Sequence, residues 1–126
     1  MTLFLRAALL LLGLLYLAIG SGFLFAPDRL GEAFGVAAGG AQGLSTMRAD
    51  FTAFFWVLGG ALVWGGWRSR GDVLWVAAAL IGIALAGRGL SLLADGNYAN
   101  ALQPMVVEGV TLVLALIAAR HFRRGG

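Results

Sequence analysis

Long apolar runs, broken by short polar stretches, account for most of the chain. A helix that crosses roughly 30 Å of hydrocarbon needs about 20 largely apolar residues. Four runs are candidates for such spans, and they cover residues 3–25, 47–67, 73–94 and 105–119. The pattern predicts an all-α integral membrane protein in which residues 1–126 form a single domain, a four-helix transmembrane bundle.

The first run begins like the apolar segment of a signal peptide, with Ala7 and Ala8 followed by leucines. It is longer than the roughly 7 to 15 apolar residues of such a segment, and no Ala-x-Ala cleavage site follows it. We therefore expect this run to be retained as the first span.

The connection between the first two spans contains two different kinds of sequence. Pro27 stands where a helix would begin, and Leu30 and Phe34 are four residues apart on one face. This spacing predicts a short interfacial helix. Residues 35–43 are rich in glycine and alanine and predict a flexible connection, after which Ser45 or Thr46 is expected to cap the second span.

Small residues recur on the second and third spans, where they would let helix backbones approach closely. On the third span, Ala78, Gly82 and Ala86 form one row. On the second span the candidates are Gly59, Gly60, Gly65 and Gly66. We expect these rows to be contacts within the bundle, and a homo-oligomer contact is the alternative.

Composition narrows the chemistry that the chain can perform. Hydrophobic residues make up 60% of the sequence, there is no cysteine, and the single histidine is His121. These counts exclude a multi-histidine or thiolate metal site within one chain, and they predict no metal and no cofactor. The nine basic residues are scattered arginines without a soluble basic domain, so nucleic acid is not an expected partner.

The arginines predict how the spans are oriented, because loops on the cytoplasmic side carry an excess of basic residues. Arg29 lies in a loop on one side of the membrane. The other side carries six arginines, which are Arg6, Arg68, Arg70, Arg120, Arg123 and Arg124. Both termini are therefore predicted to be cytoplasmic.

Four charged residues fall within or at the start of the predicted spans: Arg48, Asp50, Arg88 and Glu108. The orientation places all four in the outer half of the bilayer, where a charge facing lipid is unfavourable. We expect them to turn inward, with Arg88 and Glu108 as the first pair because consecutive helices are neighbours.

Hydroxyl groups are expected to extend this charged network. Ser91 is one turn from Arg88, Thr52 is one turn from Arg48, and Tyr16 is in the middle of the first span. The loop of residues 95–100 would form the rim. Two interpretations remain open: the charges only hold the bundle together, or they line a ligand pocket.

Several short motifs resemble a known family. They are Gly13-Leu14-Leu15-Tyr16, Phe25-Ala26-Pro27, Arg48-Ala49-Asp50-Phe51 with Phe54-Phe55, Gly87-Arg88-Gly89, and Asp95-Gly96. The chain resembles, over nearly its whole length, short bacterial four-span membrane proteins that carry domain of unknown function 4345. This resemblance implies a four-span fold in the bacterial inner (plasma) membrane and no particular activity. A looser similarity to DoxX-like four-helix membrane proteins rests on architecture alone.

The leading hypothesis for function is an inner-membrane protein that binds or moves a small polar, anionic or lipid-like ligand. The arginines would hold its head group in a pocket of Arg48, Asp50, Arg88 and Glu108. One alternative is a small membrane enzyme with Asp50 or Glu108 as acid or base. An arginine neighbour favours the ionised carboxylate, which weakens that case. The other alternative is an accessory subunit of a larger membrane complex.

Overall fold

The computed structural model describes residues 1–96 and 102–125, and within these residues the chain is helical with no strand. Its elements are α1 (Thr2–Phe25), α2 (Pro27–Ala33), α3 (Gly40–Thr46), the π-helical turn η1 (Met47–Phe51), α4 (Thr52–Arg68), α5 (Gly71–Asp95) and α6 (Leu102–Gly125). The predicted all-α fold is thereby confirmed.

Among the described residues, four stretches of helix are long and apolar enough to cross a membrane. They are Thr2–Phe25, the continuous helix Gly40–Arg68, Gly71–Asp95 and Leu102–Phe122. Each of the four predicted runs lies within one of these helices. Length and composition thus make the chain a multi-pass membrane protein with a helical bundle fold.

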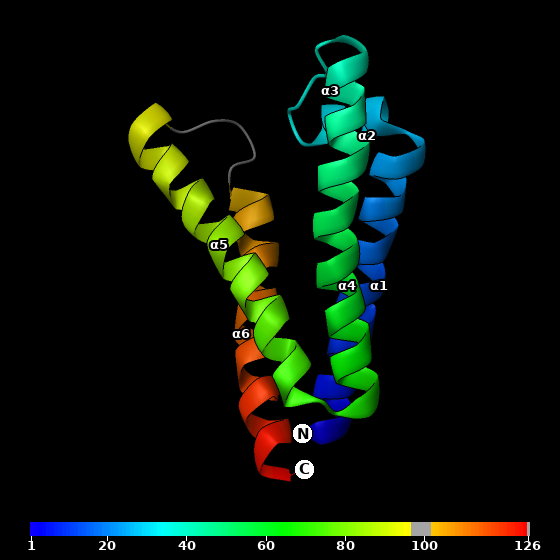
Figure 1. The fold of residues 1–126 in the computed structure, drawn as a ribbon. Helices are drawn as coiled ribbons and strands as arrows, with labels where there is room; N and C mark the ends of the chain where they lie inside the picture. Colours follow the sequence, from blue (N-terminus) through cyan, green and yellow to red (C-terminus); the bar gives the residue numbers. More distant parts are fainter. Residues whose placement is uncertain (97–101, 126) are drawn as a thin grey trace.

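The four long helices pack as two hairpins (Figure 1). Helix α1 packs along α4, which we call the first hairpin, and α5 packs along α6, which we call the second hairpin. The two termini lie at one end of the molecule, the terminal end, and α2 and α3 lie at the opposite end, the distal end (Figure 1). The hairpins meet at the terminal end and diverge toward the distal end.

A buried apolar cluster holds the four helices together mainly toward the terminal end. Its members are Leu5, Leu9, Tyr16, Leu58, Ala61, Leu62, Leu74, Ala77, Ala78, Ile81, Ala115, Ala118, Ala119 and Phe122. Many of these side chains are small, which lets the helices approach closely. The apolar core is therefore concentrated toward the terminal end, and the Arg88–Glu108 ion pair lies closer to the distal end.

Polar contacts also join the helices at the terminal end. Arg6 donates hydrogen bonds to the carbonyl oxygens of Gly66 (3.1 Å) and Trp67 (2.9 Å), near the C-terminal end of α4. Such carbonyls have no partner within the helix, so an arginine satisfies them well. The hydroxyl of Thr2 is 2.7 Å from Nε2 of His121, which connects α1 with α6.

The turn between α4 and α5 is tight and charged. Ser69 adopts a left-handed conformation with φ of 52°, and the N–H of Arg70 closes the turn onto the carbonyl of Gly65. Arg70 also forms an exposed ion pair with Asp72 at 2.7 Å. The hydrogen bond to Asp72, and then its charge, raise the pKa of Arg70 above the ordinary value.

The predicted rows of small residues are confirmed in part on α4 and in part on α5. Gly59, Gly65 and Gly66 contact neighbouring helices, whereas a side chain at Gly60 would meet open space. On α5 the buried row is Leu74, Ala77, Ala78 and Ile81. Ala86 is exposed, and Gly82 has only an ordinary contact with Leu112. Of the predicted α5 row, Ala78 is therefore part of the buried core, whereas Ala86 is not.

The first connection contains more helix than predicted. The short helix expected after residue 26 is present as α2. The expectation that residues 35–43 form a flexible connection is wrong from Gly40 onward, because α3 begins there and continues through η1 into α4. The predicted cap is also wrong: Thr46 lies inside this helix, and its hydroxyl donates to the carbonyl of Gln42 at 3.1 Å.

Candidate functional site

An ion pair between α5 and α6 lies in the distal half of the second hairpin. Nε of Arg88 donates a hydrogen bond to Oε1 of Glu108 at 2.7 Å. The side chain of Glu108 is only 10% exposed and that of Arg88 is 29% exposed. The predicted pairing of these two residues is thus confirmed, and it keeps a nearly buried carboxylate neutralised.

A cavity of about 430 Å³ lies beside this ion pair, where the two hairpins diverge. Its lining residues are Phe34, Val36, Asp50, Phe51, Phe54, Phe55 and Arg88. They come from the first connection, from η1, from α4 and from α5. The volume is within the roughly 300–1,000 Å³ of small-molecule sites. The arrangement, apolar walls with a few polar groups, is also typical of such sites.

The aromatic residues of this cavity belong to a packed cluster. The ring of Phe55 lies 5.7 Å from that of Phe23, 5.7 Å from that of Phe34 and 5.1 Å from that of Phe54. Phe51 meets Phe23 edge to face at 4.9 Å. Rings at these separations attract one another beyond their apolar burial. The cluster therefore gives the cavity a firm wall on the first hairpin.

The π-helical turn η1 brings Asp50 and Phe51 to the cavity. A π-turn holds more residues than an α-turn, which changes the direction of the side chains it carries, and such turns are frequent at functional sites. Met47, at the start of η1, is buried, and its methyl group occupies the space where a side chain at Gly31 would lie. This contact fixes η1 against α2.

The segment of residues 36–39 crosses the distal end between two glycines. Gly35 has φ of 74° and Gly40 has φ of 79°, which are values that glycine adopts without strain. These two residues turn the chain at either end of the segment. Val36 is thereby placed at the cavity.

The structure separates the predicted charged cluster into three environments. Arg88 and Asp50 line the same cavity from opposite hairpins, and Glu108 is paired with Arg88 behind it. Arg48 is exposed, and its Nε donates to the carbonyl of Leu24 (3.1 Å) in the last turn of α1. That position suits a cation, because the carbonyl end of a helix is partly negative.

The three predicted hydroxyls hydrogen-bond to groups other than the arginines. Thr52 donates to the carbonyl of Gly20 (3.2 Å), and Ser91 donates to Asp95 (3.1 Å). Tyr16 is buried, and its hydroxyl is 2.8 Å from that of Thr111. The hydroxyl hydrogens of Thr52 and Ser91 are thus used by a main-chain carbonyl and by Asp95, and the expected extension of the charged network through these hydroxyls stays a prediction. Of the predicted rim, residues 97–100 lie outside the described residues.

Sequence reasoning missed Thr111 and the aromatic wall. Thr111 is fully buried on α6, one turn after Glu108, and its hydroxyl donates to the carbonyl of Val107 at 2.8 Å. Its spacing from Glu108 was the available signal, because residues three apart share a helix face. The rings of Phe34, Phe51 and Phe54 had no such signal, since phenylalanine is equally common in cores and facing lipid.

The site carries charge and apolar surface rather than metal ligands. Within the described residues, no group of three or more His, Cys, Asp or Glu side chains could hold a metal ion. A guanidinium can hold a carboxylate or phosphate with several N–H donors, and a carboxylate can accept from an ammonium group. The cavity is thus suited to recognising charged groups on a partly apolar molecule.

The fold and the site together define a multi-pass helical membrane protein with a charged, aromatic-lined cavity at its distal end. No family model matches the chain, and neither a curated protein nor a solved structure matches it. These comparisons do not bear on the resemblance to the four-span family with domain of unknown function 4345, which stays a prediction.

Proposed function

We propose that the protein binds, and in doing so carries or presents, a small ligand with a polar or charged head and a lipid-like remainder. The observation that carries this proposal is the cavity in which Arg88 and Asp50 stand beside the aromatic wall. A purely structural ion pair between α5 and α6 requires no cavity beside it. Here Arg88 both forms the ion pair with Glu108 and lines the cavity.

The placement of charge supports this function. A charged residue at the centre of a membrane helix costs about 2.5–3.5 kcal/mol even on the most lenient scale. Pairing with Glu108 offsets part of this cost for Arg88. Ionisable groups in membrane spans commonly mark ligand or ion sites. For the enzyme alternative, Glu108 is held by Arg88 and is not among the residues that line the cavity, which leaves Asp50 as the candidate acid or base.

We also propose that the protein lies in the bacterial inner membrane with both termini in the cytoplasm. Arg6, Arg68, Arg70 and Arg120 are near the terminal end, and loops rich in arginine favour the cytoplasmic side. Exposed tryptophans of α4 and α5 near that end, Trp64, Trp67 and Trp75, are typical of a membrane interface. This orientation would put the cavity in the outer half of the bilayer.

Native mass spectrometry of the protein extracted in mild detergent tests the proposed function. The test variant is Arg88→Met with Glu108→Met, which removes both charges of the pair and leaves no unpaired charge. The matched control is Arg70→Met with Asp72→Met, an ion pair at the terminal end with side chains 52% and 65% exposed. Total charge is the same in all three proteins.

We expect the wild type and the control to carry a co-purifying amphiphile and the Arg88/Glu108 variant to lose it. Circular dichroism and size-exclusion chromatography establish that each variant is folded. Equal retention by both double variants would contradict the proposal, as would a wild type that carries nothing above the detergent background.

A further inference from the structure

Charge is divided unevenly between the two ends of the molecule. The terminal end contains the six arginines of the predicted cytoplasmic side and one acid, Asp72, which gives it a formal charge of +5. The rest of the chain has three arginines and five acids, a formal charge of −2. Positive charge at one end of a membrane protein attracts the anionic head groups of the leaflet around it.

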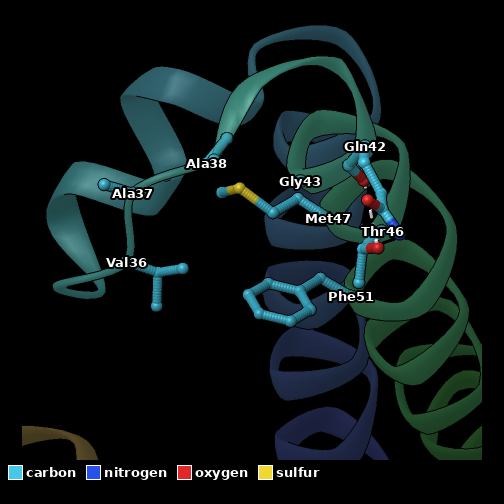
Figure 2. A pocket seen from close by; sticks show the side chains of 9 residues that line it. Val36, Ala37, Ala38, Gln42, Gly43, Thr46, Met47 and Phe51 are labelled. Carbon is cyan, nitrogen blue, oxygen red and sulfur yellow. Dashed lines mark hydrogen bonds between the residues drawn. The ribbon is translucent and has the colours of Figure 1, made fainter.

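The distal end has no such excess of positive charge. A second cavity of about 420 Å³ lies there, between residues 36–39 and α3 with η1 (Figure 2). Its lining contains no charged residue, and the hydroxyl of Thr46 already donates to the carbonyl of Gln42. In the first cavity, Asp50 is beside Arg88, whose charge is offset by Glu108. The excess of positive charge therefore belongs to the terminal end alone.

Arg68 lies beside exposed indole rings in the last turn of α4. Its side chain is exposed, and its Cζ atom is 5.5 Å from the centroid of the Trp64 ring. Trp64 is 49% exposed and Trp67 is 61% exposed. Residues three and four apart share a helix face, so Trp64, Trp67 and Arg68 lie together. Tryptophan is favoured at the membrane interface, and its ring attracts a guanidinium. The three side chains thus form a basic and aromatic surface at head-group level.

The charge of Arg68 is not offset by an acid. The ion pairs among the described residues are Arg70 with Asp72 and Arg88 with Glu108. The acid of the terminal end is therefore already used by Arg70. A guanidinium binds phosphate well, because several N–H groups can donate to its oxygens at once. Arg68 is thus available for an anion outside the protein.

The last carbonyl groups of α4, which would repel an anion, are covered. The C-terminal end of a helix is partly negative. Here Arg6 donates to the carbonyls of Gly66 and Trp67, and the N–H of Arg70 donates to the carbonyl of Gly65. Arg6 therefore also brings a second guanidinium to the last turn of α4. Both effects favour an anion at this turn.

We infer that the last turn of α4 binds the phosphate of an anionic phospholipid from the surrounding leaflet. Arg68 holds the phosphate, Arg6 adds positive charge at the same turn, and Trp64 and Trp67 lie beside the lipid at the interface. A lipid whose head also carries a cation gains less, because the acid of this end is paired. This surface is separate from both cavities, so the inference goes beyond the proposed function and does not depend on it.

Native mass spectrometry of the full-length protein, titrated in detergent micelles, tests the inference. The probes are a phosphoglycerol lipid and a phosphocholine lipid with identical chains, together with soluble glycerol phosphate as a competitor. We expect the phosphoglycerol lipid to bind about fivefold more tightly, which is the effect of one basic residue near anionic lipid. Added salt should reduce this preference. Soluble glycerol phosphate should compete only weakly, because it lacks the chains that keep the lipid in the micelle.

Matched variants assign the contact. Arg68→Gln should abolish the preference for the phosphoglycerol lipid. Arg29→Gln is the control: it removes the same charge from an exposed residue of α2 at the distal end, and it should preserve the preference. The double variant Arg88→Met with Glu108→Met should preserve it as well, because these residues belong to the first cavity. Circular dichroism establishes that each variant is folded.

Four outcomes would overturn the inference. Equal affinity of the folded wild type for the two lipids would exclude a preference for anionic lipid. Equal losses in Arg68→Gln and Arg29→Gln would assign the preference to total charge rather than to the turn. Competition by soluble glycerol phosphate as strong as that by the lipid would indicate a site for free phosphate. Loss of the preference in the Arg88/Glu108 variant alone would place the anionic lipid in the first cavity, which would support the proposed function instead.

Discussion

The two hairpins use glycine in opposite ways. In the first hairpin, a Cβ atom added at Gly13 would lie 2.8 Å from the carbonyl oxygen of Gly59, and one added at Gly59 would lie 2.7 Å from that of Gly13. In the second hairpin, a Cβ atom at Gly87, Gly89 or Gly109 would meet nothing within 4 Å. The first hairpin is closed by backbone contact, and the second by side chains, including the Arg88–Glu108 pair.

This difference shows why the number of glycines in a membrane helix says little about its packing. Glycine is required only where two backbones touch, because no other residue allows that approach. Elsewhere it weakens a helix slightly and can be replaced. The first hairpin should therefore be intolerant of any added side chain at its contact, while the second should depend on charge.

The largest effect is expected from Gly59→Ala. The added methyl group would overlap the backbone of α1, so the hairpin must separate, at a cost of about 3 kcal/mol or more. Thermal unfolding in detergent measures this loss. Gly60→Ala is the control on the neighbouring residue: its methyl group meets open space, and it should stabilise the protein by about 0.5–1 kcal/mol. Equal melting temperatures for the two variants would refute the backbone contact.

An intermediate effect is expected from Glu108→Gln. Arg88 would keep a hydrogen-bonding partner but lose the compensating charge, which should cost about 2 kcal/mol. Buried pairs lose roughly 3–5 kcal/mol when one partner is removed. The smaller value applies here because the Arg88 side chain is 29% exposed. Adding Arg88→Met to Glu108→Gln should recover part of the loss. If Glu108→Gln is as stable as wild type, the second hairpin does not depend on the pair.

The smallest effect is expected from Gly87→Ala on α5. The new methyl group would face open space, so helix propensity alone should act, with a gain of about 0.5–1 kcal/mol. Chemical denaturation with circular dichroism detection is sensitive enough to measure it. A strong destabilisation would mean that Gly87 contacts another molecule in the membrane, as in a homo-oligomer or a larger complex, and crosslinking of the wild type would then be the next measurement.

Hydropathy predicted the long helices well because the requirement of length and apolarity is local. The α2 helix was also predictable, from Pro27 and the spacing of Leu30 and Phe34. The helical state of residues 40–46 was not, because glycine and alanine next to serine and threonine usually indicate a loop. Continuity with η1 and α4 extends the helix through these residues despite their weak propensity.

The only contact of the site that the sequence predicted correctly is the ion pair between two oppositely charged residues inside the spans. Arg88 and Glu108 had to pair, since both lie within spans that are adjacent in the sequence. Arg48 was misplaced because a main-chain carbonyl of another helix, that of Leu24, leaves no trace in the sequence. The π-turn that directs Asp50 to the cavity could not be predicted either, because the sequence was analysed with the 3.6-residue period of the α-helix.

The tight turn at Ser69 connects the two hairpins, so a rotation of the backbone at this turn would move the distal end of α5. Arg88 lies 17 residues along α5 from Gly71, which is about 26 Å at 1.5 Å per residue, so that a rotation of about 5° at the turn moves Arg88 by about 2 Å. Side chains next to the turn, such as Leu74, would move least, and Ile81 would move more because it is farther along α5. Such a rotation would also stretch the buried hydrogen bond between Tyr16 and Thr111, which joins the two hairpins near Glu108, so this bond limits how far the distance between Asp50 and Arg88 can change.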